Sequence, residues 1–339
     1  MLVAPTRSAT VAIDRASSQG PVLLVRVLDA ASGRPLPNAE VGSVDDGTRQ
    51  LTNVAGEARV AWPPTRTLRL RVRQIGFRFA ERTVRAGEEG AADTAVFVLE
   101  RVPIVLPELR ATALQPCETN VDPEAARLSL VALEQLQLAA EHYRQFEKSY
   151  PFEARLERRT AYLNEDGKSK RLAVWEERAP SDKFGERYQR GDVLHRRGRA
   201  FDAKLLFIVA LADTSFWEAH CLTVRGVEER DARRLIRLDF APIADMRSPD
   251  WAGTAWLDSA SSVLRRLDFR LTGLEERDDP GRLEGYTTFV EPSAFITFPD
   301  SNVAYWWLKR PAADGGWGVP DVLQLLRVKE VQYRKATPP

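Results

Sequence analysis

The feature that most constrains this chain is the return of apolar side chains at every second position. Leu and Val alternate with Arg over residues 68–73, and apolar residues alternate with charged ones over 236–240 and 266–271. A period of two places one face of an extended strand in a core and the other face in water. Consecutive strands of this kind, without helices between them, pair antiparallel. The sequence therefore predicts a mostly β protein.

The first part of the chain predicts a small β-sandwich over residues 21–101. Short strands are separated there by turn signals such as Ser32-Gly33-Arg34-Pro35 and Asp45-Asp46-Gly47. Many short strands punctuated in this way are typical of a sandwich. Residues 1–20 are rich in Ser, Thr, Ala and Gly without a period, which predicts a mobile tail.

A connector and one helix follow. Residues 102–121 are rich in proline and predict an extended linker. The helix is predicted over 122–150, because Asp122 is a good N-cap and Pro123 suits the first helical position. Its apolar stripe runs to Phe146, whereas its polar face carries Glu and Gln instead of the basic residues of a membrane-surface helix. We therefore expect the helix to pack on the C-terminal domain.

Residues 151–335 return to strands. The predicted strands include 204–210, 221–227 and 234–240, and 251–257 forms a hairpin with 263–274. A long antiparallel meander with one apolar face must curl around something, and the preceding helix is the candidate. The sequence thus predicts a curved antiparallel β domain.

Charge and hydropathy exclude several classes of protein. The chain has 339 residues, with 49 basic and 48 acidic side chains and a net charge of +1, which argues against nucleic-acid binding. Its longest apolar run, 205–212, is far shorter than the roughly 20 residues that a spanning helix needs, so no transmembrane helix is expected. The first 20 residues lack the apolar core of a signal peptide. The protein is therefore either cytoplasmic, or its leader is missing from this sequence.

No catalytic, metal or cofactor motif is present. The three histidines form no HExxH or HxxE pattern, and no GxSxG, SxxK, Walker or GxGxxG motif occurs. Glu218, His220 and Cys221 are neighbours, but strand alternation would turn Cys221 to the opposite face from the other two. The sequence predicts a protein that is not an enzyme and binds no cofactor. A hydrolase that uses paired carboxylates is the remaining enzymatic alternative.

Aromatic residues are the candidate ligand contacts. Trp306 and Trp307 are adjacent, so alternation places their rings on opposite faces of a strand, and Trp317 lies in a glycine-rich loop. An exposed tryptophan can stack on a sugar or a lipid chain, whereas core packing is the commoner role. We keep Trp306, Trp307 and Trp317 as stacking candidates.

Two stretches carry resemblances to known families. VRVLDAASGRPLPNAEV, LTNVAGEARV and LRLRVRQIGFR, in this order, resemble the carboxypeptidase regulatory-like domain, a transthyretin-like sandwich. GTAWLDSASSVLRRLDFRLTGL resembles the strand-turn-strand units of curved-sheet periplasmic proteins related to lipoprotein carriers, whose sheets form half-barrels. The whole chain resembles largely uncharacterised exported bacterial proteins that join two such parts. The resemblance implies a periplasmic, secreted or outer-membrane-associated location.

The resemblance also bears on the cysteines. Cys117 and Cys221 are the only two, and they either pair in an exported protein or stay as thiols in a reducing cytosol. Both matching positions are usually cysteine in the exported group, which implies a disulfide from the connector to the sheet.

The expected function is that of a non-catalytic, exported accessory or binding protein of the cell envelope, whose sandwich has a carbohydrate-binding-like fold. The alternative is a carrier or sensor that binds an apolar ligand, such as an acyl chain, in the curved sheet. The carboxylate-dependent hydrolase comes third. The partner is unknown, with a glycan, a lipid or an envelope protein as the candidates.

Overall fold

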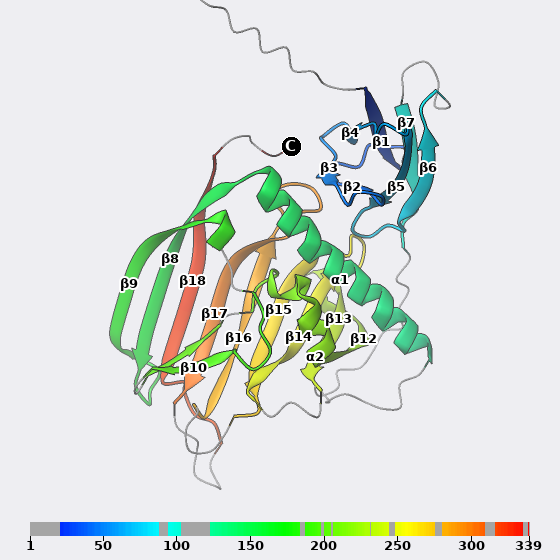
Figure 1. The fold of residues 1–339 in the computed structure, drawn as a ribbon. Coiled ribbons are helices and arrows are strands. Elements are labelled where there is room, and N and C mark those ends of the chain that lie inside the picture. The colour runs from blue at the N-terminus through cyan, green and yellow to red at the C-terminus, as the bar shows by residue number, and fades with distance from the viewer. Residues whose placement is uncertain are drawn as a thin grey trace, which may run out of the picture.

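A computed structural model describes residues 21–87, 94–102, 123–183, 187–197, 200–204, 206–230, 232–243, 248–274, 280–308, 316–334 and 338. Within them, two small sheets, a long helix and one large curved sheet follow one another along the chain (Figure 1). The predicted mostly β fold class is therefore confirmed. The predicted tail over 1–20 and nearly all of the predicted connector over 102–121 lie outside the described residues.

The N-terminal unit is a sandwich of two sheets. One sheet has the order β4-β1-β7 and the other the order β3-β2-β5-β6, and β1 and β7 are parallel. Its strands are β1 (Val22–Asp29), β2 (Glu40–Ser43), β3 (Arg49–Leu51), β4 (Glu57–Ala61), β5 (Thr67–Arg73), β6 (Ala80–Arg85) and β7 (Thr94–Leu99). In β5 the alternating Leu and Val side chains are buried in the core between the sheets and the Arg side chains point outward, as the period of two predicts.

The large sheet has nine strands, all antiparallel, in the order β12-β13-β14-β15-β16-β17-β18-β8-β9. It is an unbroken meander except that β8 and β9, which come first in the chain, join the sheet beside its last strand. The strands are β8 (Phe152–Leu163), β9 (Ser169–Pro180), β12 (His220–Arg230), β13 (Arg233–Pro242), β14 (Asp250–Asp258), β15 (Leu264–Thr272), β16 (Arg282–Val290), β17 (Phe298–Trp307) and β18 (Val322–Tyr333).

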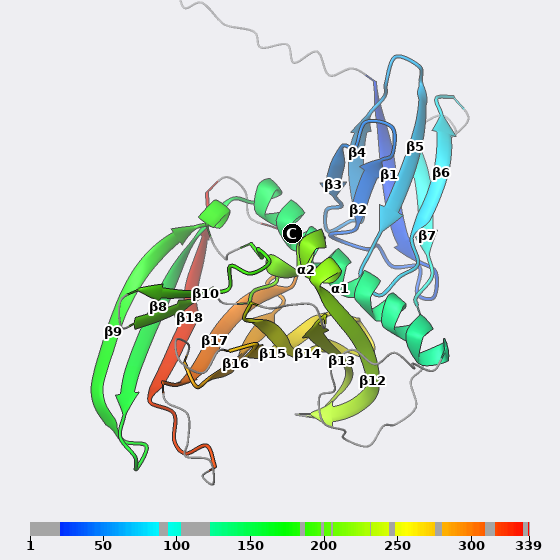
Figure 2. The same cartoon turned by 60° about the horizontal axis from the view of Figure 1, so that its bottom comes forward.

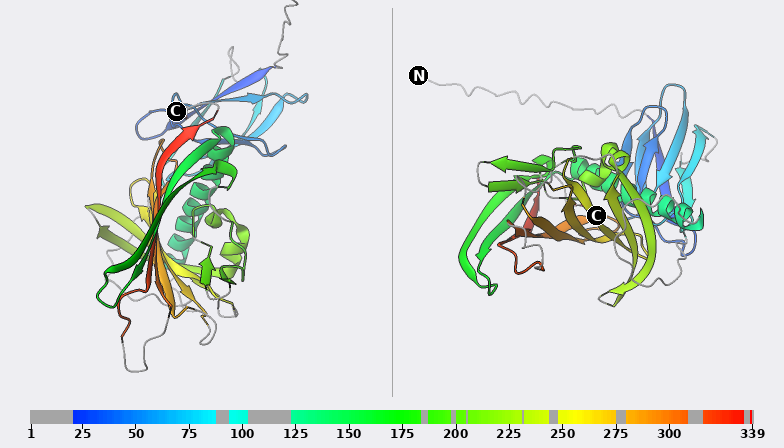
Figure 3. Two further views of the ribbon diagram at one scale, coloured as in Figure 1. Left: turned by 90° about the vertical axis from the view of Figure 1, so that its left-hand side faces the viewer. Right: turned by 90° about the horizontal axis from the view of Figure 1, so that it is seen from below.

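The nine-stranded sheet bends into an arch with helices on its inner, concave side (Figures 2 and 3). Helix α1 (Pro123–Ser149) crosses this side. The described residues between β9 and β12, which we call the cover segment (those within 181–219), lie over the same face. They form η1 (Ser181–Lys183), a hairpin of β10 (Leu194–Arg197) and β11 (Ala200–Ala203), η2 (Ala210–Ala212) and α2 (Thr214–Ala219).

One apolar core joins the sheet, α1 and the cover segment. Helix α1 contributes Leu136, Ala140 and Tyr143, which recur every three to four residues and therefore share one face. Tyr143 packs against Phe298 of β17, with 5.9 Å between the ring centroids. Helix α1 therefore packs against the concave face of the nine-stranded sheet.

The sandwich is fastened to the rest of the molecule at its lower end. Asn38 donates a hydrogen bond to Ser293 Oγ at 2.7 Å, in the loop between β16 and β17. Phe77 packs edge-on against Phe295 of the same loop, with 6.1 Å between centroids. Gly76 lies so close to the β14–β15 turn that a Cβ atom there would be 2.8 Å from the carbonyl oxygen of Ser261. Only glycine fits at that position, where φ is also +82°.

One predicted strand is wrong. Of the predicted strand 204–210, the described residues 204 and 206–210 form no strand but lead through a turn into η2, and the apolar side chains of 206–210 are buried under the sheet. A short continuous apolar run has no period, so it does not distinguish a buried strand from other buried segments. Among the described residues, no helix is both long and apolar enough to span a bilayer.

Candidate ligand-binding site

One row of side chains crosses the concave face from its outer edge toward its buried centre. Arg171 of β9 lies directly opposite Tyr162 of β8, which lies opposite Val322 of β18. Val322 in turn lies opposite Trp306 of β17, which lies opposite Leu283 of β16. Residues directly opposite each other in an antiparallel sheet share a face, so these five side chains form one row.

The row runs from solvent into the core. Tyr162 is 43% exposed, whereas Val322 is 7%, Trp306 4% and Leu283 0% exposed. The Arg171 guanidinium lies 5.8 Å from the centroid of the Tyr162 ring. No acidic group among the described residues forms an ion pair with Arg171. The row therefore begins with a cation and an aromatic ring at the surface and ends in apolar side chains.

Glycines shape the centre of the same face. Gly253 of β14 lies opposite Phe269 of β15, and Gly285 of β16 lies opposite Phe269 from the other side. A Cβ atom at Gly253 would be 2.7 Å from Cζ of Phe240, and one at Gly285 would be 3.0 Å from Cζ of Phe269. The two glycines thus leave space that phenylalanine rings from neighbouring strands fill.

The cover segment closes this face through apolar contacts. Its hairpin β10–β11 forms a separate two-stranded sheet, and none of its described residues pairs with a strand of the nine-stranded sheet before β12 begins. Its side chains belong to the same core as the sheet and α1. The largest group of its buried members is Leu206, Phe207, Ile208, Val209, Leu211 and Phe216, and the others are Tyr188, Val193, Ala203, Ala210 and Ala219. The cover is therefore attached mainly by burial of apolar surface, which needs no fixed register.

A few polar contacts fasten the cover. The Tyr188 hydroxyl donates to Asp250 Oδ2 at 2.6 Å, and Thr287 Oγ1 donates to the carbonyl oxygen of Leu206 at 3.1 Å. Burial raises the pKa of Tyr188, and the bond to Asp250 raises it further, so the hydroxyl remains a donor at physiological pH. Arg144 of α1 forms an ion pair with Asp213 at 2.7 Å.

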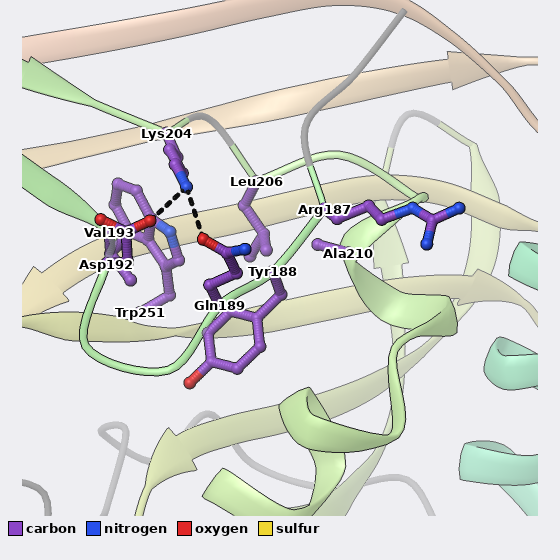
Figure 4. A pocket seen from close by; sticks show the side chains of 9 residues that line it. All are labelled: Arg187, Tyr188, Gln189, Asp192, Val193, Lys204, Leu206, Ala210 and Trp251. Carbon is purple, nitrogen blue, oxygen red and sulfur yellow. Dashed lines mark hydrogen bonds and ion pairs between the residues drawn. The ribbon is translucent and has the colours of Figure 1, made fainter. Parts of the chain in front are cut away.

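A small pocket marks the place where the cover meets the sheet (Figure 4). Its lining residues are Arg187, Tyr188, Gln189, Asp192, Val193, Lys204, Leu206, Ala210 and Trp251. The Lys204 ammonium group contacts Asp192 Oδ2 at 2.6 Å and Gln189 Oε1 at 3.2 Å. The pocket volume is about 10 Å³, which is the lower limit for a single water molecule. The polar groups here therefore fasten the cover and leave no room for a ligand.

The structure separates the three predicted stacking residues. Trp306 and Trp307 do lie on opposite faces, and Trp306 Nε1 donates to Gln324 Oε1 at 2.9 Å on the concave side. Trp307 meets Trp317 on the convex side, with 6.0 Å between ring centroids. The Arg282 guanidinium lies 4.9 Å from the Trp307 ring and 5.5 Å from the Trp317 ring. Trp317 is 40% exposed.

The histidines are dispersed, and the described residues contain no cluster of three or more potential metal ligands. Glu218 belongs to helix α2, so the expectation that it shares a strand face with His220 is wrong. His220 is buried, with its two ring nitrogens 2.7 and 2.9 Å from the carbonyl oxygens of Phe216 and Trp251. His195 lies 3.2 Å from Asp192 at the surface. The nearby residues explain both positions without a metal.

Cys221, at the start of β12, takes part in a disulfide bond. Its predicted partner, Cys117, lies outside the described residues, so that pairing stays a prediction.

Two features of the surface escaped the sequence analysis. The first is the row that begins at Arg171, because cross-strand neighbours depend on register and strand order. The second is a polar groove of about 690 Å³ between the sandwich and α1. Arg73 bridges Glu40 and Glu141 beside this groove, at 2.6 and 2.5 Å. The groove is lined by Glu40, Gly47, Thr48, Arg49, Glu141, Arg144, Gln145 and Lys148.

Comparisons with known proteins give distant structural similarity only. No protein-family model matches the chain, and no curated protein does. A LolA superfamily protein from Nitrosomonas europaea matches with 9% identity and a TM-score of 0.33, over 60% of this chain and 94% of that one. A putative outer membrane lipoprotein-sorting protein domain from Vibrio parahaemolyticus matches with 11% identity and a TM-score of 0.32, over 60% and 94%. A DUF1329 family protein from Desulfovibrio piger matches with 10% identity and a TM-score of 0.29, over 61% and 95%.

Proposed function

We propose that this protein is a non-catalytic carrier or sensor of the bacterial cell envelope, and that it holds an acyl chain between the concave face and the cover segment. The observation that carries this proposal is the row from Arg171 to Leu283. A surface cation followed by a half-exposed aromatic ring and then by buried apolar side chains matches an amphipathic molecule with an anionic head and a hydrocarbon tail. The head would lie at Arg171 and the tail over Val322 and Trp306.

The dimensions of the row agree with such a ligand. The row crosses five neighbouring strands, and strands in a sheet are about 4.8 Å apart, so it is about 19 Å long. A chain of this length would bury a few hundred Å² of apolar surface, at roughly 25 cal/mol per Å². That gain would offset the exposure of apolar surface when the cover segment moves aside.

The disulfide at Cys221 supports the location in this proposal. Disulfides persist in oxidising compartments such as the periplasm, and are rare in a reducing cytosol. The sandwich, in the same proposal, is a carboxypeptidase regulatory-like accessory module that is fixed to the curved nine-stranded sheet and does not contact the acyl chain.

Quenching of tryptophan fluorescence by a brominated fatty acid, 9,10-dibromostearic acid, tests the proposal. Bromine quenches a ring that it contacts, so we expect saturable quenching with one fatty acid per chain. Trp306→Phe should remove most of the quenching while binding persists. Trp317→Phe is the matched control, because Trp317 is an exposed ring on the convex face, and this variant should be quenched like the unaltered protein.

The head group has its own test. Arg171→Gln should weaken binding of the free acid about tenfold, as expected for loss of a charge-assisted contact, and leave binding of the methyl ester unchanged. Absence of saturable quenching in the unaltered protein would refute the carrier. Equal quenching of Trp306→Phe and the unaltered protein would do the same.

A second candidate function rests on the convex face. Trp307, Trp317 and Arg282 form an exposed aromatic and cationic cluster, and such clusters can stack on sugar rings. In this case the protein is an envelope accessory protein that binds a glycan. Titration with chitohexaose distinguishes the two candidates, because binding that Trp317→Ala abolishes and Trp306→Phe leaves intact would favour the glycan.

A further inference from the structure

The polar groove between the sandwich and α1 has the size of a small-molecule site. Its volume is about 690 Å³, and ligand pockets usually measure roughly 300–1,000 Å³. One wall is formed by the start of β2 and the turn into β3, and the other by the C-terminal half of α1, beside which β3 lies (Figure 1). The lining contains no apolar or aromatic side chain. The groove therefore suits a polar ligand and not an acyl chain.

One end of the groove is acidic. Arg73 bridges the carboxylates of Glu40 and Glu141 there, and two carboxylates with one guanidinium leave one net negative charge. Arg49 answers this charge only from the surface, because its side chain is 49% exposed and its Nη1 lies 3.3 Å from Glu141 and 3.8 Å from Glu40. Ion pairs of such exposed groups are weak. The acidic end can therefore attract a cationic group of a ligand.

A buried oxygen atom at the acidic end lacks a hydrogen-bond donor. Glu40 is 3% exposed, and its Oε1 accepts two hydrogen bonds from Arg73. Its Oε2 accepts none within the described part of the chain, since Arg49 at 3.8 Å is beyond hydrogen-bond distance. A buried acceptor without a donor is unfavourable, so a ligand that donates hydrogen bonds is favoured here. An ammonium group supplies both the donors and the positive charge.

The other end of the groove is cationic. Glu141 and Lys148 are separated by two turns of α1, so they lie on one face of the helix with about 10.5 Å between their Cα atoms. Arg144, between them, is already paired with Asp213 at 2.7 Å. Lys148 is exposed, and no acidic group among the described residues forms an ion pair with it. Lys148 can therefore bind an anionic group of a ligand.

The middle of the groove is uncharged and open. It is lined by Gly47, Thr48 and Gln145, and a Cβ atom at Gly47 would meet nothing within 4 Å. Gln145 Nε2 donates to the carbonyl oxygen of Arg49 at 3.0 Å, which leaves its amide oxygen as an acceptor. A peptide backbone between the two charged ends would supply an N–H donor for this oxygen.

We propose that this groove binds a short zwitterionic peptide, with its terminal ammonium group at Glu40 and Glu141 and its terminal carboxylate at Lys148. An extended tripeptide is about 10 Å long, at roughly 3.3–3.6 Å per residue, which matches the separation of the two ends. Capture of peptide termini by charged and polar groups is a known mode of recognition. The groove lies outside the row from Arg171 to Leu283, so the proposal holds or fails independently of acyl-chain binding.

Isothermal titration calorimetry of the full chain with trialanine tests the proposal. We expect saturable binding with one peptide per chain. N-acetyl-trialanine lacks the ammonium group and trialanine amide lacks the carboxylate, so each should bind about tenfold more weakly, as expected for loss of a charge-assisted contact. Dialanine should also bind more weakly than trialanine, because it is too short to reach both ends of the groove.

Variants of the protein assign each end. Lys148→Met should weaken binding of trialanine about tenfold and leave binding of trialanine amide unchanged, because the amide has no carboxylate to lose. Lys168→Met, at an exposed lysine in the turn between β8 and β9, is the matched control and should bind both peptides like the unaltered protein. Glu141→Gln, at a half-exposed position, should weaken binding of trialanine and leave that of N-acetyl-trialanine unchanged.

Three results would overturn the proposal. The first is the absence of saturable binding up to about 5 mM trialanine, which would show that water satisfies the Glu40 oxygen. The second is equal affinity for trialanine and N-acetyl-trialanine, because the acidic end would then not bind the ammonium group. The third is an equal affinity of Lys148→Met and Lys168→Met for trialanine, which would place the peptide elsewhere on the protein.

Discussion

Gln135, in the middle of helix α1, accepts a hydrogen bond from the backbone N–H of Gly76 in the sandwich, with 2.6 Å between the two atoms. Both residues are buried. The bond connects the helix that lines the curved sheet to a sandwich position where only glycine fits. The bond therefore fixes the sandwich at a defined point on the domain that contains the curved nine-stranded sheet.

The first prediction concerns this bond. Gln135→Leu keeps the volume of the side chain but leaves the Gly76 N–H buried without an acceptor, which costs about 1–3 kcal/mol. Urea denaturation should show this loss, and hydrogen exchange should show reduced protection of the Gly76 amide. Glu134→Leu, on the exposed side of the same helix, should change stability by less than about 0.5 kcal/mol. Equal stability of the two variants would contradict the role of Gln135.

The second prediction concerns pH and His142 of α1, which is fully buried. Neither ring nitrogen has a hydrogen-bond partner among the described residues. Burial, helped by the nearby Arg73 and opposed by Glu141, lowers the pKa of His142 from 6.5 to about 3. Between these two pH values the unfolded chain binds a proton that the folded chain excludes. The contribution of neutral His142 to the free energy of unfolding is therefore fully present above pH 6.5 and is lost as the pH is lowered toward 3.

The measurement is the free energy of unfolding at several pH values between 4 and 7.5. His142 should contribute a slope of up to about 1.4 kcal/mol per pH unit below its unfolded-state pKa. His142→Leu removes this contribution, and subtraction of the two curves cancels the carboxylates that titrate in both proteins. Parallel curves for the two proteins would show that His142 is protonated in the folded state or accessible to water.

Local patterns predicted the faces of the strands well. In β15, Leu267, Phe269 and Leu271 alternate with charged residues, and all three are buried on the concave side. The same reasoning placed Trp306 and Trp307 on opposite faces. These predictions succeed because side-chain direction in a strand depends on the strand alone. Helix α1 was equally predictable, since its stripe and its first-turn proline are local signals.

The candidate site was not predictable in the same way. The row from Arg171 to Leu283 brings together residues from five strands, and strand order places β8 and β9 beside β18 instead of β12. A meander read in chain order would have put β9 next to β12. The predicted strand in the cover segment failed for another reason. Residues 206–210 are all apolar, so they show no period, and their structure is set by what they pack against.

The third prediction concerns the floor of the concave face. Gly253→Ala would place a Cβ atom 2.7 Å from the Phe240 ring, as well as against the neighbouring backbone, so the strands must shift. Overpacking of this kind costs about 1–3 kcal/mol. Gly316→Ala is the control, because nothing lies within 4 Å of a Cβ atom there. Thermal unfolding should show a lower midpoint for Gly253→Ala alone, and unchanged midpoints for both variants would show that the floor adapts.

The fourth prediction tests whether the cover segment moves. Tyr188→Phe removes the hydroxyl that donates a hydrogen bond to the fully buried carboxylate of Asp250. That carboxylate still accepts a hydrogen bond from the backbone N–H of Trp251, at 2.7 Å. Loss of one donor to a buried carboxylate costs about 1–3 kcal/mol, and because Tyr188 lies in the cover, the cost applies to the closed state. Hydrogen exchange in residues 206–219 should become several-fold faster, and dibromostearic acid should quench tryptophan fluorescence at a higher rate. Tyr286→Phe is the matched control, since Tyr286 lies on the convex face opposite Asp268 and no hydrogen bond within the described structure involves its hydroxyl. This variant should leave both rates unchanged. Faster exchange spread evenly over sheet and cover would instead show that Tyr188 stabilises the whole domain, and the cover would then not be a separately moving element.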